Sequence, residues 1–120
     1  MPNEAEAITI RFADDFEANL YALAKRYRSI RNDVQPVIEQ IQAGNFIGDR
    51  IPGMGEDYII LKVRVKNSNI QKGKSAGYRL IYQVESPSIV LLLTIYSKSD
   101  RTDISLNEIR SIIAEFDENQ

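Results

Sequence analysis

The sequence contains no cysteine, no histidine and no tryptophan among its 120 residues. The first two absences exclude zinc fingers, iron–sulfur clusters, the usual haem ligands and catalytic triads built on cysteine or histidine. Any acid–base chemistry must therefore use carboxylates, lysine or tyrosine. The chain also lacks an apolar run of about 18 residues, and its first seven residues lack the basic start and apolar core of a secretory signal. We therefore expect a soluble, cytoplasmic protein with no membrane contact.

The length predicts a single domain over residues 1–120, because a chain of this size can bury roughly two-thirds of its unfolded surface in one core. The net charge is −2, but the charges are unevenly spread. Residues 1–49 carry 5 basic and 8 acidic side chains, residues 50–101 carry 9 and 4, and residues 102–120 carry 1 and 5. A basic middle between acidic ends favours an anion-binding surface, with ordinary charge scatter as the alternative.

Hydrophobic periodicity predicts a short strand followed by two helices in the first half of the chain. Ile8, Ile10 and Phe12 alternate with polar residues, which predicts a strand with one buried face. Helical spacing follows over residues 16–27, where Asp14 and Glu17 resemble an N-terminal capping signal. A second helical pattern covers residues 30–41 and ends at residues 43–44, with a proline at position 36 that marks either its start or a kink. The short connection predicts a helical hairpin.

The second half of the chain predicts an irregular connection, three strands and a final helix. Residues 44–57 hold four of the six glycines, and strand patterns follow over 58–66, 78–84 and 89–96. The last strand is nearly all apolar and is expected inside the sheet, after a tight turn at 85–88. Ser105 and Glu108 form a capping pair at the start of a helix that reaches Phe116. The element order is β-α-α-β-β-β-α, and the class is α+β.

The strand over 58–66 carries the clearest chemical signal. Since side chains alternate across a strand, Lys62, Arg64 and Lys66 share the face opposite the apolar residues. Arg79 joins them if the register of the next strand allows, and the connecting loop adds Lys72 and Lys74. Such a set of cations favours a polyanionic ligand. The alternatives are a solvated outer face of the sheet and a merely soluble hairpin tip.

Tyr96 and Lys98 follow the apolar strand, where a ring or a phenolic hydroxyl would stand beside a cation. Taken singly, Tyr96 is better explained as an aromatic at the edge of the core, and Lys98 as a solvated loop charge. The acidic pairs at 56–57 and at 100 and 103 match no specific metal-binding spacing, so we expect no metal site.

Three segments resemble the RelE/ParE superfamily of bacterial type II toxins, within its HigB-like and RelE-like branch. They are residues 48–55 (GDRIPGMG), 72–82 (KGKSAGYRLIY) and 92–98 (LLTIYSK). The resemblance extends over about residues 12–113, nearly the whole chain, and the middle segment is the most specific. It implies a RelE-like β-α-α-β-β-β-α fold with an antiparallel sheet packed by a helical hairpin and a C-terminal helix.

The resemblance also implies a function, namely a ribosome-dependent mRNA endoribonuclease, or mRNA interferase, that inhibits translation and is held inactive by a cognate antitoxin protein. The reaction would be metal-independent cleavage by the 2′-hydroxyl, with no small-molecule cofactor. By similarity, Arg79 would stabilise the phosphate in the transition state, and Lys98 would act as acid or as a second phosphate clamp. The candidate catalytic residues are Arg79, Lys98, Tyr96 and Arg64, and the candidate RNA-binding residues are Lys62, Lys66, Lys72 and Lys74.

The chain departs from the family in having no histidine and no tyrosine at its C-terminus, so the general base is unassigned. Two alternatives stay open. One is a ParE-type toxin that acts on DNA gyrase without phosphate chemistry. The other is a catalytically degenerate member that only binds its antitoxin.

Overall fold

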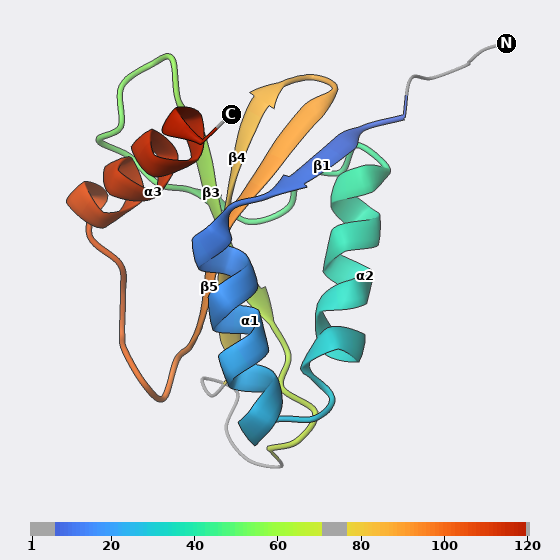
Figure 1. Cartoon of the computed structure of the whole chain (residues 1–120). Helices are drawn as coiled ribbons and strands as arrows, with labels where there is room; N and C mark the ends of the chain where they lie inside the picture. Colours follow the sequence, from blue (N-terminus) through green and yellow to red (C-terminus); the bar gives the residue numbers. More distant parts are fainter. Residues whose placement is uncertain (1–6, 71–76, 120) are drawn as a thin grey trace, which may run out of the picture.

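The computed structural model describes residues 7–70 and 77–119, and its element order agrees with the sequence prediction except for one additional strand (Figure 1). That addition is a two-residue strand inside the connection that was expected to be irregular throughout. In chain order the elements are β1 (Thr9–Phe12), α1 (Asp14–Arg26), α2 (Ile30–Gln42), β2 (Asp49–Arg50), β3 (Ile59–Val65), β4 (Tyr78–Ser86), β5 (Ile89–Ser97) and α3 (Leu106–Glu118).

The five strands form one mixed sheet in the order β1-β5-β4-β3-β2. The prediction of an antiparallel sheet is wrong at one pair, because β1 runs parallel to β5. The other three pairs are antiparallel, and each joins strands that are consecutive in the chain. β1 is followed by α1 rather than by a tight turn into a neighbouring strand, so it is not constrained to pair antiparallel as the two strands of a hairpin are. β5 lies inside the sheet between β1 and β4, as its apolar sequence predicts.

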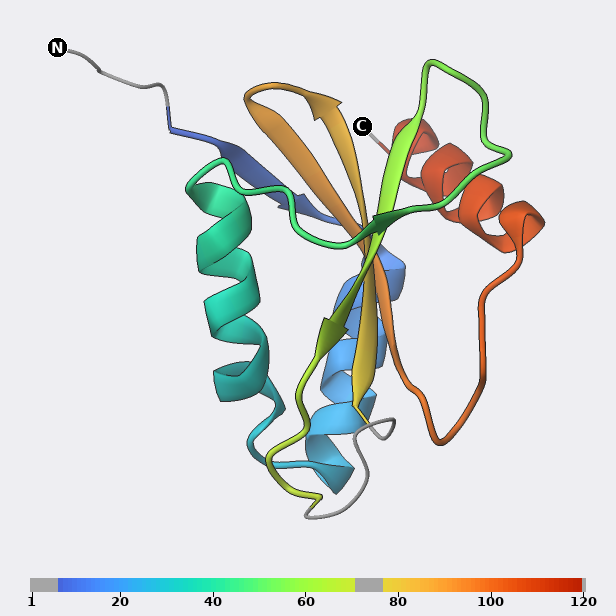
Figure 2. The ribbon, with the colours of Figure 1, turned by 180° about the vertical axis from the view of Figure 1, so that it is seen from behind.

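Helices cover both faces of the sheet and divide the core into two parts. α1 and α2 pack on one face, over the apolar side of β3 and alternate residues of β4 and β5. α3 packs on the other face, where Ile109, Ile112 and Ile113 meet Ile60 and Ile81. α3 covers only part of that face, and the strands extend past it toward the segment that joins β5 to α3 (Figure 2).

Two features at the helix and strand ends test the local predictions. Ser105 is the N-cap of α3, and its hydroxyl accepts a hydrogen bond from the Glu108 amide at 3.1 Å, which confirms the capping pair. The capping signal proposed for Asp14 is wrong, because the N-cap of α1 is the buried Ala13 and its side chain makes no cap hydrogen bond. Phe12 is 41% exposed, so the predicted buried face of the first strand is incomplete. β1 is an edge strand with little of the core on its outer side.

Two features of the chain from α2 to β2 follow from backbone geometry. Pro36 lies inside α2, which continues through it and ends near the predicted residues. Gly48 has a φ of +114°, a conformation that L side chains rarely adopt. A Cβ there would lie 2.6 Å from the carbonyl oxygen of Lys62. Gly48, having no Cβ, therefore lets the backbone before β2 lie close to the backbone of β3.

Candidate nucleic-acid interface

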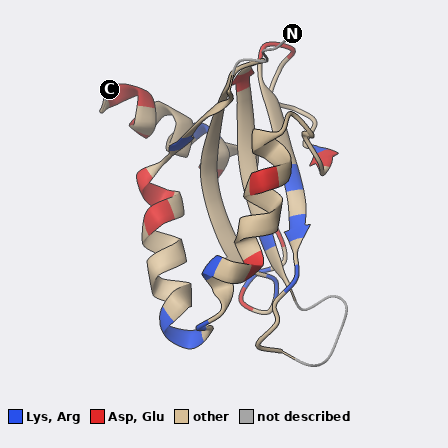
Figure 3. Ribbon diagram, turned by 90° about the vertical axis from the view of Figure 1, so that its right-hand side faces the viewer, with Lys and Arg blue, Asp and Glu red and all other residues tan. Residues whose placement is uncertain are grey.

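The sheet register brings Arg64, Arg79 and Tyr96 into one row across three strands. Arg64 of β3 lies directly opposite Arg79 of β4, and Arg79 lies opposite Tyr96 of β5. Residues directly opposite one another share a face, so the three side chains stand on the face that α3 covers only in part. The register therefore places Arg79 on the same face as Lys62 and Arg64, which the sequence alone left open. Figure 3 shows the basic positions of β3 as separate blue bands along the strand, as expected from the alternation.

Arg79 is a buried cation whose charge has no acidic partner among the described residues. It is 8% exposed, and its Nη1 donates a hydrogen bond to the carbonyl oxygen of Tyr78 at 3.2 Å. Arg64, directly across the strand pair, is exposed and forms no ion pair in the described part of the chain either. Like charges that face each other across a sheet are destabilising, and a buried charge needs a counter-ion. An anion placed between the two guanidinium groups would supply it, and phosphate geometry suits arginine.

Tyr96 is 6% exposed, and its hydroxyl has no hydrogen-bond partner among the described residues. Burial raises the pKa of this phenol, and the negative charge of Asp103 raises it further, whereas the charges of Arg79 and Arg101 act in the opposite sense. The phenol is therefore neutral at physiological pH and has a proton to donate. Together with Arg79, it offers a hydrogen-bond donor and a positive charge on one face.

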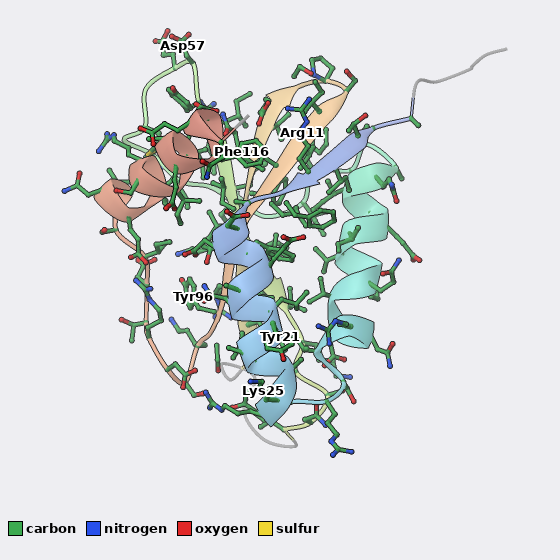
Figure 4. All side chains as sticks on the ribbon, viewed as in Figure 1. Arg11, Tyr21, Lys25, Asp57, Tyr96 and Phe116 are labelled. Carbon is green, nitrogen blue, oxygen red and sulfur yellow. The ribbon has the colours of Figure 1, made fainter. Side chains whose placement is uncertain are left out.

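Arg101 fixes the segment that follows β5 and shields the ring of Tyr96. Its guanidinium carbon lies 5.2 Å from the ring centroid. Its Nη1 and Nη2 donate to the two carboxylate oxygens of Glu108 at 3.0 and 2.7 Å, and its Nε donates to the carbonyl oxygen of Asp103 at 3.0 Å. Arg101 holds the pKa of Glu108 below its ordinary value. Figure 4 labels Tyr96 between α1 and this segment.

A groove of about 270 Å³ opens beside this cluster. Its lining residues come from α1, from the end of β5 and from the segment that follows β5, and they include Tyr96, Arg101, Arg26 and Asp100. Arg26 donates to Asp100 across it at 2.8 Å. Arg101 is not among the site residues predicted from the sequence, because nothing in the local pattern distinguishes it from other basic residues. Its partner lies seven positions away on α3, and its ring contact depends on the path of the segment between the two.

The remaining candidate lysines are placed differently from one another. Lys62 lies on the same face as Arg64, as its alternation predicts, and its Nζ is 3.4 Å from Asp103 Oδ1. Lys66 is exposed and follows the end of β3. Lys98 follows β5, and its Nζ donates to the carbonyl oxygen of Thr102 at 3.1 Å. The candidates Lys72 and Lys74 lie outside the described residues.

The row of Arg64, Arg79 and Tyr96 presents two cations and a neutral phenol rather than a metal-ligand set. Among residues 7–70 and 77–119, no three histidine, cysteine, aspartate or glutamate side chains gather as metal ligands would. The two acids of the segment after β5 instead pair with basic side chains, Asp100 with Arg26 and Asp103 with Lys62. What this arrangement can do chemically is hold a phosphate, stabilise negative charge that develops on it, and donate a proton.

The sequence matches no protein-family model and no curated protein. None of the helices in the described part of the chain has the length and hydropathy that crossing a lipid bilayer requires.

Proposed function

We propose that this chain is a ribosome-dependent mRNA endoribonuclease of the RelE/ParE superfamily, the toxin of a type II toxin–antitoxin system. The observation that carries the proposal is the row of Arg64, Arg79 and Tyr96. It combines a buried arginine and a buried tyrosine hydroxyl, and within residues 7–70 and 77–119 the arginine has no acidic partner and the hydroxyl no hydrogen bond. A phosphate would provide the partner that each group lacks there. The α+β class and the order of helices and strands support the same proposal.

The reaction divides among these residues as follows. The 2′-hydroxyl of a ribose loses its proton to a water molecule, its oxygen attacks the adjacent phosphorus, the bond to the 5′-oxygen of the next nucleotide breaks, and a 2′,3′-cyclic phosphate forms. Negative charge builds on the non-bridging oxygens as the bonds change, and Arg79 with Arg64 stabilises that charge. The Tyr96 hydroxyl donates a hydrogen bond to the same phosphate. Lys98 supplies a proton to the departing 5′-oxygen or clamps the phosphate as a second cation.

The partner of this toxin would be an antitoxin protein that covers its cationic sheet face. A small antitoxin that covers the cationic face would block RNA binding sterically and by charge. Lys62 and Lys66, together with Lys72 and Lys74, would bind the RNA on either side of the cut by contacts to its phosphates.

The test is cleavage of a defined mRNA in a translating extract, with cut sites mapped by primer extension. We expect ribosome-dependent cuts with the wild-type chain and none with Arg79→Ala or Lys98→Ala. Arg31→Ala is the matched control, since it removes one positive charge from the exposed face of α2 and should cut as the wild type does.

Intact mRNA with the wild-type chain would overturn the nuclease. Toxicity that persists in Arg79→Ala would point instead to a non-nuclease poison of the gyrase-binding kind. A chain that cuts nothing and is not toxic, but still binds an antitoxin, would be a degenerate member.

A further inference from the structure

Lys62 differs from the two arginines of the same face because an acidic side chain already neutralises it. Its Nζ lies 3.4 Å from Asp103 Oδ1. Neither Arg64 nor Arg79 has an ion-pair partner among the described residues. Asp103 belongs to the segment after β5, so a residue distant in sequence has been brought onto the basic strand.

The backbone and a second ion pair hold the Asp103 carboxylate in this place. Oδ1 also accepts a hydrogen bond from the Ile104 amide at 2.8 Å, and the Asp103 carbonyl oxygen accepts one from Arg101 Nε. Arg101 is in turn fixed by Glu108. The Ile104 amide and the charges of Lys62 and Lys98 lower the pKa of Asp103, so its carboxylate is ionised at neutral pH.

The groove around Lys62 is open and contains a second acid for comparison. Its volume is about 500 Å³, and Asp49, Arg50, Lys62, Asp103 and Ser105 are among its lining residues. Asp49 of β2 lies directly opposite Lys62 in the sheet register, but the two form no ion pair. Two carboxylates of equal charge therefore flank the same lysine, and only one of them contacts it.

We propose that Lys62 is a phosphate subsite of the RNA path and that Asp103 is an internal competitor, which occupies this subsite in the protein alone and leaves it when RNA enters the groove. This inference rests on the function proposed above.

Exchanging Asp103 for a phosphate costs little free energy. The side chains of Lys62 and Asp103 are 32% and 65% exposed, and ion pairs so accessible to water contribute little to stability. A phosphate anchored at Arg64 and Arg79 would bring its neighbour along the strand close to the Asp103 carboxylate and repel it. A single phosphate ion lacks that anchorage. The subsite therefore selects a chain of linked phosphates over a free anion.

The test is binding of a short fluorescent RNA whose 2′-hydroxyls are methylated so that it cannot be cleaved, measured by anisotropy at several salt concentrations. Asp103→Asn removes the charge but keeps an oxygen that can accept from the Ile104 amide. We expect it to bind the RNA about threefold to fivefold more tightly than the wild type at low salt, which is the upper range of an exposed ion pair. Asp49→Asn makes the same change of charge in the same groove, and we expect less than about a twofold gain. In the double variant Asp103→Asn/Lys62→Ala the gain should vanish.

Equal gains in Asp103→Asn and Asp49→Asn would overturn the inference, because net charge alone would then explain them. Weaker binding by Asp103→Asn would also overturn it. Arg79→Ala separates this inference from the proposed function. If that variant binds as the wild type does, the phosphate role proposed for Arg79 fails and the inference fails with it. If neither the wild type nor any variant binds the RNA, the inference alone fails, because ribosome-dependent cleavage is tested separately in the translating extract. If Arg79→Ala weakens binding and Asp103→Asn changes nothing, only the inference fails.

Discussion

Replacing Tyr96 with phenylalanine removes one oxygen atom from the row and leaves the ring in place. In the protein alone this hydroxyl is buried and has no hydrogen-bond partner among the described residues. A buried, unsatisfied polar group costs about 1–3 kcal/mol. We therefore expect Tyr96→Phe to raise the free energy of unfolding by about 1 kcal/mol while mRNA cleavage falls, because the hydroxyl would find its partner only on bound RNA. A substitution that raises stability and lowers activity indicates that the removed group destabilises the free protein and serves to bind the ligand.

Tyr82 provides the matched control inside the same sheet. It is also buried, but its hydroxyl donates to the Ile47 carbonyl oxygen at 2.5 Å. Burial raises the pKa of this phenol to about 12, so it is a neutral donor at all ordinary pH values. We expect Tyr82→Phe to lower the free energy of unfolding by about 1–2 kcal/mol, since it leaves the carbonyl without its donor.

Urea unfolding followed by circular dichroism measures both stabilities, and primer extension in a translating extract measures cleavage. If Tyr96→Phe destabilises the protein as much as Tyr82→Phe does, the Tyr96 hydroxyl is hydrogen-bonded in the protein alone, and the reasoning is refuted. Full cleavage activity in Tyr96→Phe would refute the claim that the hydroxyl binds the RNA.

Two further predictions concern backbone strain and pH. Gly48→Ala should lower the free energy of unfolding by about 2 kcal/mol, because its Cβ meets the Lys62 carbonyl. Gly55→Ala, at a φ of +95° with open space around it, should cost only about 1 kcal/mol, and equal losses in urea unfolding would contradict the steric argument. Glu108, whose pKa is lowered by Arg101, stabilises the fold above the ordinary glutamate pKa of about 4.3, and this contribution is lost as pH falls through its lower folded value. Unfolding between about pH 5 and pH 3 should therefore show a smaller loss of stability in Glu108→Gln than in the wild type, by less than about 1 kcal/mol, and parallel curves would exclude this linkage.

Much of the fold follows from local patterns. The helical spacing of apolar residues predicted all three helices, and the Ser105–Glu108 pair predicted the start of α3 where the structure has it. The capping signal at Asp14 failed because a buried alanine precedes α1 and the tertiary contacts of that residue outweigh its poor capping ability. The parallel pairing of β1 with β5 was missed because no local pattern encodes which distant strand an edge strand will join.

The sequence by itself determined which face of β3 each residue takes, because side chains alternate along any strand. It placed Lys62 and Arg64 together for that reason. The sequence could not determine which residues of the neighbouring strands lie opposite Lys62 and Arg64. The register that sets Arg79 between Arg64 and Tyr96, and the path that brings Asp103 to Lys62, depend on pairings between residues far apart in the chain. Long-range packing of the whole sheet selects those pairings, so only the tertiary structure decided them.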